Sequence, residues 1–421
     1  MDTIFALSSG LPPAGIAVVR VSGSGAADAL ATLAGRLPSP RRASYASLTA
    51  KDGTELDRAL VLWLPGPATA TGEDIAELHL HGGRAVVAAV EGALAGMPGL
   101  RRAQPGEFTR RAFANGRIDL AEAEGLADLL SAETEGQRRA AIAMAGGALS
   151  RQVETWRVEV LALSAAVEAV LDFGDEDDVG DLPPSVLERA RSLADEIDGW
   201  LARPSAERLR DGIRVILAGP PNAGKSSLFN ALVDSDASIV TAIPGTTRDL
   251  VERPVAIGGV PFVFVDTAGL HESTDDEVEK IGIARAEAEI ARADIVLWLG
   301  EEGQGPEGAW DIEAKCDLGP NKSAPRMRVS ATTGAGVDGL RGALCEAARH
   351  LLPVPGDVAL NRRQREELEA VQTDLRISAR DNLLIVGERL RLARTAFDRI
   401  TGRASTDDML DVLFGRFCIG K

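Results

Sequence analysis

The sequence predicts a multidomain protein: an N-terminal α+β domain, then a helical domain into which an α/β domain with a mostly parallel sheet is inserted. The hydrophobic pattern changes from short aliphatic runs to helical spacing near residue 118. It changes again to alternating strands and helices near residue 211, and returns to helical spacing after residue 350. A chain of 421 residues allows about two to three domains. We therefore expect four segments, over residues 1–117, 118–210, 211–350 and 351–421.

Short aliphatic runs bounded by glycine and proline, such as GIAVVRVSG and RALVLWLPG, predict strands in the first segment. A helix over residues 85–97 is expected after the strand IAELHLHGG. His79 and His81 fall on one face of that strand. Because no third ligand of matching character is visible, we interpret them as polar residues at a strand end and not as a metal site.

Residues 118–173 are rich in alanine, leucine and glutamate, with apolar residues at helical spacing, which predicts long amphipathic helices. A further helix is expected from about Pro184 to Leu209. The acidic run Asp175–Asp178 between them lacks the alternating ligands and the closing glutamate of a calcium loop. We interpret that run as a solvated connection.

The chain is acidic, with 46 basic and 63 acidic residues and a net charge of −17. The excess lies in residues 118–210, with 9 basic and 20 acidic residues, and in residues 211–350, with 13 and 22. The two terminal segments are slightly basic, so they can meet a small anion. This distribution argues against a protein that coats nucleic acid mainly by neutralising phosphates.

Two further features indicate where the protein works. No run approaches the roughly 18 apolar residues of a membrane span. The three cysteines, Cys316, Cys345 and Cys418, are unclustered, which fits a reducing compartment better than a disulfide framework or a zinc site. We therefore expect a cytoplasmic protein without a membrane span.

The strongest chemical signal is the phosphate-binding loop GPPNAGKS, from Gly219 to Ser226, between the strand IRVILAG and the expected helix SSLFNALV. Its glycines allow backbone N–H groups to face phosphate oxygens, and the N-terminus of the following helix adds positive potential. Lys225 is expected to reach the β- and γ-phosphates, and Ser226 is expected to bind Mg²⁺.

Two further segments are expected on the phosphate side. Asp266 ends the strand PFVFV, where an aspartate can hold the Mg²⁺ shell, and the N–H of Gly269 can sense the γ-phosphate. Thr246 and Thr247 lie in IPGTTRD, a loop whose turn residues allow it to change order with the nucleotide. These residue types in this order predict a nucleotide switch.

The segment AKCDL predicts which base is bound. Lys315 and Asp317 follow the strand ADIVLWLG, and the carboxylate can accept two hydrogen bonds from the N–H edge of guanine. Together the motifs resemble the set found in GTPases. In that family the segment that corresponds to AKCDL has the pattern NKxD. Ala314 stands where the asparagine belongs, so a buried amide that normally braces the loops is missing, while Asp317 keeps the preference for guanine over adenine. The residues expected to contact GTP are Asn222, Ala223, Gly224, Lys225, Ser226, Ser227, Thr241, Ala242, Ile243, Pro244, Gly245, Thr246, Thr247, Asp266, Thr267, Ala268, Gly269, Lys315, Asp317, Ser330, Ala331 and Thr332.

The whole chain resembles the MnmE (TrmE) family of tRNA-modification GTPases, within the TrmE-Era-EngA-like GTPases. The resemblance is carried by Asn222, by GTTRD and DTAGL, by the blocks PPAGIAVVRVSG, EDIAELHLHGG and PGEFTRRAFANGRIDLAEAEGLADLL, and by the C-terminal FCIGK. It implies that residues 1–117 bind tetrahydrofolate and dimerise the protein. It also implies a helical domain, residues 118–210 and 351–421, that carries the P-loop GTPase α/β domain, residues 211–350, as an insertion.

The resemblance implies a function in RNA modification. Together with an FAD-dependent partner, MnmG (GidA), such a protein adds a carboxymethylaminomethyl-type group to carbon 5 of the wobble uridine in certain tRNAs. GTP hydrolysis is stimulated by K⁺ when the GTPase domains of a homodimer approach each other. A heterotetramer with MnmG is expected, and tRNA is expected to be contacted mainly through that partner.

The alternative function is a GTPase switch in ribosome assembly. Such proteins usually append a basic RNA-binding domain after the GTPase domain. This chain instead returns to helices and ends in FCIGK, which favours tRNA modification.

The resemblance also implies roles for single residues. Glu279 would position the attacking water and act with Lys225 in catalysis, and Thr247 would bind Mg²⁺ with Ser226. The K⁺ ligands would be Asn222, Thr241, Ile243 and Thr246. A 5-formyl- or 5,10-methylene-tetrahydrofolate would be bound by Arg20, Glu77, Arg117 and Lys421.

The residue types at the implied folate site fit the ligand. The three basic groups suit the anionic glutamate tail of folate, and the carboxylate suits the paired N–H donors of a pterin. The family usually has lysine at the position of Arg117, which keeps the charge and changes the geometry. Cys418 is either a nucleophilic or redox thiol beside the folate or a small buried residue.

Overall fold

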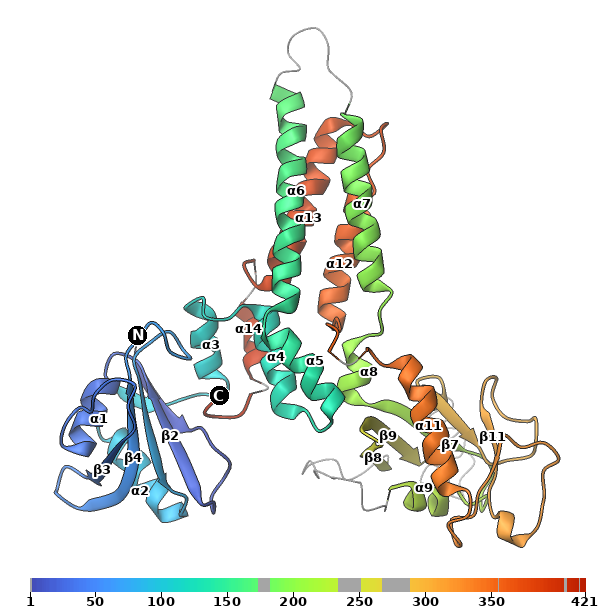
Figure 1. Ribbon diagram of the computed structural model, residues 1–421, viewed down its shortest axis with the longest axis horizontal. Coiled ribbons are helices and arrows are strands. Elements are labelled where there is room, and N and C mark those ends of the chain that lie inside the picture. Colours follow the sequence, from blue (N-terminus) through green and yellow to red (C-terminus); the bar gives the residue numbers. More distant parts are fainter. Residues whose placement is uncertain are drawn as a thin grey trace, which may run out of the picture. The chain divides into compact units, whose positions relative to one another are not determined.

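The computed structural model describes residues 2–172, 182–233, 251–266, 288–354, 356–404, 407–415 and 417–421. The chain divides into two compact units. The first consists of Met1–Ala127, Ser150–Glu154 and Phe397–Lys421, so it contains both ends of the chain (Figure 1). The second consists of Asp128–Leu149 and Thr155–Ala396.

A six-stranded sheet in the order β3-β4-β5-β2-β1-β6 organises the first unit. Neighbouring strands are antiparallel except β1 and β6, which are parallel. The elements are β1 (Thr3–Leu7), β2 (Ile16–Ser22), α1 (Ala26–Ala34), β3 (Ser44–Thr49), β4 (Glu55–Leu64), β5 (Ile75–His81), α2 (Arg84–Ala95), β6 (Leu100–Arg102) and α3 (Glu107–Ala114). The predicted α+β domain is confirmed, and α2 is the helix expected over residues 85–97.

The two faces of this sheet are covered differently. Helices α1 and α2 bury one face, where Leu30 and Val90 pack with Phe5, Val19 and Leu78 of the strands. This apolar layer forms the core of the N-terminal domain, as the alternation of the strands requires.

Helix α3 covers only part of the opposite face. Its Phe108 packs against Ile4 and Ala6 of β1. Farther along the same face, Tyr45 and Leu60 form a cross-strand pair and are 68% and 48% exposed. The sheet therefore carries an open, partly apolar face over β3, β4 and β5.

Short helices continue the first unit. Helices α4 (Leu120–Ser131) and α14 (Asp407–Phe414) contribute to one small core, in which Leu120 and Ala123 pack with Phe414 and Phe417. Phe414 also lies 6.1 Å from Phe113, measured between ring centroids. The end of the chain is thus packed into the N-terminal unit.

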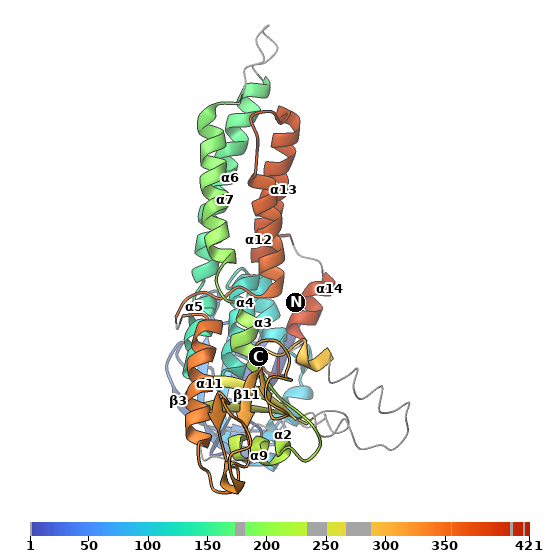
Figure 2. The ribbon, with the colours of Figure 1, turned by 90° about the vertical axis from the view of Figure 1, so that its right-hand side faces the viewer.

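Four long helices lie alongside one another in Figures 1 and 2: α6 (Ala148–Asp172), α7 (Pro184–Leu201), α12 (Arg362–Leu375) and α13 (Leu383–Thr401). In α6 the buried residues Trp156, Val160, Leu163 and Val167 recur at helical spacing, so one stripe of the helix faces its neighbours. Trp156 meets Trp200 of α7 edge to face, with ring centroids 5.3 Å apart. The predicted helical domain is confirmed.

The helix expected from Pro184 to Leu209 is two helices. Helix α7 ends at Leu201, and α8 (Ala206–Asp211) begins after Pro204. A proline has no backbone N–H and disfavours helical backbone in the residue before it, which ends the helix there. Helix α5 (Glu135–Ala145) precedes α6 and is capped by Thr134 and Gln137. No helix among the described residues is both long and apolar enough to cross a membrane.

The inserted α/β domain is built on a second six-stranded sheet, in the order β12-β11-β10-β7-β9-β8. Only β8 is antiparallel to its neighbour, which confirms the mostly parallel sheet. Its elements are β7 (Ile213–Ala218), α9 (Lys225–Val233), β8 (Val251–Ile257), β9 (Val260–Asp266), β10 (Ile295–Trp298), β11 (Trp310–Glu313), β12 (Met327–Arg328) and α11 (Val337–Leu351). The carboxyl ends of the five parallel strands share one edge, where ligands bind in such folds.

Candidate functional site

The phosphate-binding loop leaves β7 at this edge and enters α9. A Cβ on Gly219, whose φ is +146°, would lie 3.0 Å from the backbone N of Gly300, so this position requires glycine. Asn222 and Gly224 also have positive φ angles, of 61° and 98°. The loop therefore has the compact backbone that turns successive N–H groups toward one point.

Lys225 is the first residue of α9 and is 4% exposed. Its Nζ donates to the carbonyl oxygens of Gly219 and Pro220, at 2.9 Å each. Burial lowers the pKa of Lys225 from its usual value, and the charge of Asp266 opposes that shift. The buried ammonium group lies inside the loop, while Ser226 beside it is exposed at the start of the helix.

The segment predicted to recognise the base, here named the base-recognition segment, follows β11 and contacts the phosphate loop. The backbone of Lys315 is left-handed, with φ of 60°, and its Nζ donates to the carbonyl oxygen of Asn222 at 2.7 Å. Asp317 lies exposed in the short turn Cys316–Leu318, whose first N–H donates to Val329 at 3.1 Å. The structure thus brings together two motifs that are 93 positions apart in the sequence.

The second base-side loop is anchored by Ser330, which is fully buried. Its hydroxyl accepts the N–H of Thr333 at 3.2 Å, and its own N–H donates to Ala335 at 2.8 Å. Ala331 is half-buried, and Thr332 is exposed together with residues 333–336.

A cleft of about 580 Å³ lies between the phosphate loop, the end of β10 and the segment after β11. Its lining residues are Pro220, Pro221, Asn222, Ala223, Leu299, Gly300, Glu301, Glu302, Glu313, Ala314, Lys315, Asn321 and Lys322. Other predicted nucleotide and cation residues lie outside the described part of the chain: Thr241, Ala242, Ile243, Pro244, Gly245, Thr246, Thr247, Thr267, Ala268, Gly269 and Glu279.

A second polar cluster lies on the open face of the N-terminal sheet. Arg20 of β2 donates through Nη2 and Nε to Oε1 of Glu77 on β5, at 2.8 and 3.1 Å. Nε2 of His79 lies 3.2 Å from the other carboxylate oxygen. Burial alone would raise the pKa of Glu77, but Arg20 and His79 outweigh it and hold that pKa below 4.5.

The C-terminal segment docks onto the same domain. Ile419 forms a β-bridge with Pro105, and Phe417 is buried. Gly420 has φ of +95°, and a Cβ there would lie 2.0 Å from the carbonyl oxygen of Leu7. The backbone of Lys421, whose N–H donates to the carbonyl of Cys418, is therefore fixed at the end of β1, the strand that pairs with β2.

Arg117 and Cys418 have different surroundings. A Cβ on Gly72 would lie 3.2 Å from Cγ of Arg117, so this side chain follows the loop before β5. The Arg117 N–H donates to Ala112 at 2.8 Å. Among the predicted folate residues, the structure pairs Arg20 with Glu77 directly and places Arg117 beside another loop. Cys418 is exposed, so its interpretation as a small buried residue is wrong.

Comparisons with known proteins match every part of this architecture. The profile described as "GTP-binding protein TrmE N-terminus" matches residues 3–117, and the profile "MnmE helical domain" matches residues 120–418. A protein of Erythrobacter litoralis named tRNA modification GTPase MnmE is 63% identical, and one of Novosphingobium aromaticivorans with the same name is 61% identical. Both alignments cover 100% of this chain and 100% of the relative. This chain belongs to the MnmE family. A more distant MnmE, from Zymomonas mobilis, is 49% identical over the full length of both proteins.

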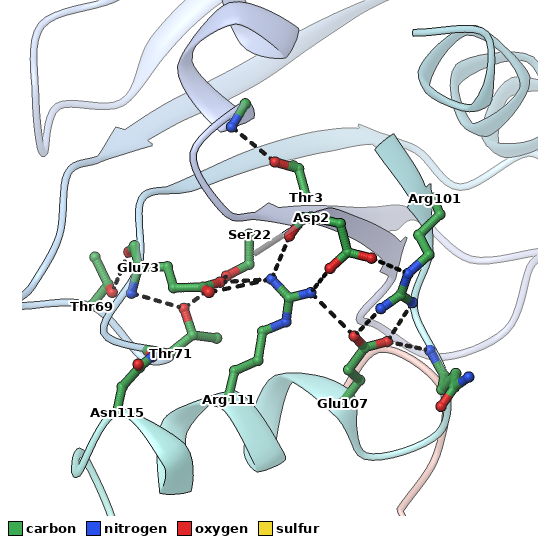
Figure 3. A network of polar contacts seen from close by, with 12 residues as sticks. Asp2, Thr3, Ser22, Thr69, Thr71, Glu73, Arg101, Glu107, Arg111 and Asn115 are labelled. Carbon is green, nitrogen blue, oxygen red and sulfur yellow. Dashed lines mark hydrogen bonds and ion pairs between the residues drawn. The ribbon is translucent and has the colours of Figure 1, made fainter. Parts of the chain in front are cut away.

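One polar network of this MnmE-family chain was not predicted from sequence (Figure 3). The guanidinium of Arg111 on α3 is 8% exposed and donates to Glu73 at 3.0 Å and to Oδ1 and the carbonyl oxygen of Asp2, both at 2.8 Å. It also donates to Glu107 at 3.2 Å, and Arg101 pairs with the same glutamate. The network ties α3 to the first strand and to the loop before β5.

The spacing of Glu107 and Arg111 is the one local signal for this network. Residues four apart lie on the same side of a helix, so the sequence EFTRR allows their ion pair. The same spacing occurs on exposed helices, so burial could not be inferred from it.

The two histidines of β5 take part in separate ion pairs. His79 contacts Glu77, and Nδ1 of His81 lies 2.8 Å from Oδ1 of Asp57. Across the described ranges, no group of three or more His, Cys, Asp or Glu side chains is arranged to hold a metal ion. Each histidine thus lies on β5 beside a carboxylate, and the interpretation that the two do not form a metal site stays a prediction.

Proposed function

We propose that this MnmE-family chain hydrolyses GTP and acts in the modification of the wobble uridine of certain tRNAs. The observation that carries the proposal is the contact of Lys315 with the carbonyl of Asn222, which joins the base-recognition segment to the phosphate loop at 2.7 Å. With this contact, one ligand can meet the phosphate-binding backbone and the Asp317 carboxylate at the same time. The names of the full-length relatives support tRNA as the target of the pathway.

The residues of the inserted domain have distinct tasks in this proposal. The phosphate loop offers its N–H groups to the phosphates, and Lys225 neutralises the charge that develops on the β–γ bridge. Ser226, Asp266 and Thr247 would hold Mg²⁺, which lowers the cost of concentrating negative charge on the transferring phosphoryl group. Glu279 would orient the attacking water.

We propose a K⁺ site at Asn222, Thr241, Ile243 and Thr246, formed when the GTPase domains of a homodimer meet. Asn222 has left-handed backbone in the phosphate loop and is exposed to solvent, which supports its role as a K⁺ ligand. Hydrolysis by the purified protein in K⁺ should exceed hydrolysis in Na⁺ at equal ionic strength. Equal rates in the two salts would contradict the cation site and would leave the GTPase proposal intact.

The N-terminal domain is proposed to bind a tetrahydrofolate derivative, either 5-formyl or 5,10-methylene. The charged form of Glu77 suits the N–H donors of a pterin, and Arg20 fixes that carboxylate. Lys421, held at the end of β1, and Arg117 would receive the anionic glutamate tail. Removal of Lys421 should weaken the binding of 5-formyltetrahydrofolate in calorimetry, and an unchanged affinity would refute the assignment of that residue.

The proposed assembly is a homodimer through residues 1–117 together with the flavoprotein MnmG, as a heterotetramer in the cytoplasm. The helical domain, residues 118–210 and 351–421, would carry the GTPase domain, residues 211–350. The open face with Tyr45 and Leu60 supports a protein contact there, because such side chains are typical of interfaces. The acidic middle of the chain supports tRNA contact mainly through the partner.

The decisive experiment is mass spectrometry of tRNA nucleosides from a strain that lacks the gene. The carboxymethylaminomethyl-type modification at carbon 5 of wobble uridine should be absent and should return when the gene is restored. A matched strain that carries the Lys225→Ala variant tests whether nucleotide chemistry is required. Unchanged wobble uridines in the deletion strain would overturn the function.

A further inference from the structure

A buried carboxylate closes the base-recognition segment of the inserted domain into a loop. Glu313 is the last residue of β11, and its side chain is 1% exposed. Its Oε1 accepts the backbone N–H groups of Asn321 and of Lys322, the latter at 3.3 Å. Its Oε2 accepts Nε–H of Arg328 at 2.6 Å. One side chain therefore holds the residues on both sides of segment 314–320.

The closed segment contains two groups that are proposed to face the nucleotide. Lys315 contacts the phosphate loop, and Asp317 lies exposed in the turn that follows. Joining the ends of a short loop restricts the conformations of the residues between them. The carboxylate of Glu313 thus limits the positions that Asp317 can take.

This chain needs such a restraint because one usual brace is absent. Ala314 stands at the asparagine position of NKxD and has no polar side-chain atom. A Cβ on Gly224 would lie 3.6 Å from the Cβ of Ala314, so Ala314 lies close to the phosphate loop and presents only a methyl group to it. Only Lys315 supplies a side-chain hydrogen bond from the closed segment to the phosphate loop among the described contacts.

We propose that Glu313 is a positioning residue for guanine recognition and that its carboxylate braces the segment which the missing asparagine amide leaves unsupported. The inference rests on the proposed binding of guanine nucleotides at this site. The N–H of Asn321, and then Arg328, hold the pKa of Glu313 below 4.5 against the effect of burial, so the brace is charged at neutral pH. A charged acceptor makes stronger hydrogen bonds than a neutral one.

Neighbouring contacts fix the far end of the closed segment. The side chain of Lys322 is 8% exposed, pairs with Asp311 and donates to the carbonyl of Trp298 at 3.4 Å. Asp311 in turn accepts the N–H of Gly303 at 3.0 Å. Strands β10 and β11 therefore supply a rigid base against which Glu313 holds the loop.

The test compares the affinities of GDP and inosine diphosphate, measured by calorimetry on the full chain. Inosine diphosphate lacks the 2-amino group that the Asp317 carboxylate would accept, so the ratio of the two affinities reports the position of Asp317. Glu313→Ala should weaken GDP binding roughly tenfold and inosine diphosphate binding much less. Ala314→Asn in the Glu313→Ala background should restore the ratio.

Asp294→Ala is the matched control. Its carboxylate, just before β10 and outside the cleft, accepts the N–H of Arg214 at 3.0 Å and pairs with Arg208 at 3.0 Å. This variant should keep the affinity ratio of the wild type. If Glu313→Ala does not fold, Glu313→Gln takes its place, because the amide keeps an acceptor oxygen and loses the charge opposite Arg328; a smaller drop of the ratio is then expected.

The outcomes separate the inference from the function on which it rests. If the Glu313 variants keep the ratio of the two affinities, whether both affinities fall equally or neither changes, the positioning role is overturned and GTP binding stays in place. If Glu313→Ala lowers the ratio of the GDP and inosine diphosphate affinities and Ala314→Asn does not restore that ratio, the positioning role is also overturned. A wild-type protein that binds neither nucleotide would refute the nucleotide site itself.

Discussion

Replacement of Gly420 by alanine should release the end of the chain from the N-terminal domain. The φ of +95° costs an alanine about 1–2 kcal/mol. In addition, the new Cβ would meet the backbone oxygen of Leu7 at 2.0 Å, so Gly420 and Lys421 must move by about 1 Å to reach an ordinary contact. Phe417, which is buried three residues earlier, should keep the rest of the segment in place.

The consequence should appear in ligand binding more than in stability. A displacement of about 1 Å would break the charge-assisted hydrogen bond proposed between Lys421 and the glutamate tail of folate, and such a bond is worth about 1.5–3 kcal/mol. The affinity for 5-formyltetrahydrofolate, measured by calorimetry, should therefore fall roughly ten- to hundredfold. Gly35→Ala is the control, because Gly35 has φ of +74° with no atom within 4 Å of the added Cβ. If both variants bind folate equally well, the close approach at Leu7 does not position Lys421.

Three other variants test separate parts of the molecule. Arg20→Leu should raise the pKa of Glu77, because Arg20 holds that pKa below 4.5. As the solution is acidified, the folate affinity of this variant should then fall at a higher pH than that of the wild type. Coincident pH profiles of the two proteins would contradict the pairing. In a denaturant titration, Arg111→Leu should lower the free energy of unfolding by about 3–5 kcal/mol, because three carboxylates lose a buried partner. Arg110 pairs with Asp411 at the surface, so Arg110→Leu should lower the free energy of unfolding by under about 1 kcal/mol. Burial alone would raise the pKa of Glu107, but hydrogen bonds from Arg101, from the N–H of Gln104 and then from Arg111 hold it below 4.5. The contribution of Glu107 to stability is therefore present above pH 4.5 and is lost as the pH falls through the lower folded-state value. Lys315→Ala removes the contact with Asn222 and should weaken GDP binding about tenfold; an unchanged affinity would show that the two loops are held together by other contacts.

Features with a local chemical signature could be predicted from the sequence. The phosphate loop lies between a strand and a helix because glycines, a lysine and a serine at fixed spacing allow only that backbone. The mostly parallel sheet followed from strands separated by enough residues for crossover helices. The resemblance to the MnmE family named Arg20 and Glu77 for one site, and the structure pairs them across β2 and β5.

Features set by tertiary contacts could not be predicted in the same way. The buried state of Arg111 depends on Asp2 and Glu73, which come from distant parts of the sequence. Glu313 ends a strand whose pattern indicates only burial, and its partners follow in a loop without a motif. Pro204 could have marked the break between α7 and α8, but the helical spacing on both sides outweighed it in the prediction.

The docking of residues 417–421 on β1 has a consequence for biosynthesis. The first unit needs Phe397–Lys421 for its small core and for the bridge of Ile419 to Pro105, so it cannot be finished until these residues have been synthesised. A nascent chain thus emerges with this part of its N-terminal domain uncovered, and a prematurely ended product keeps it so. Quality control that senses exposed apolar surface can therefore distinguish chains that contain residues 397–421 from chains that end before them.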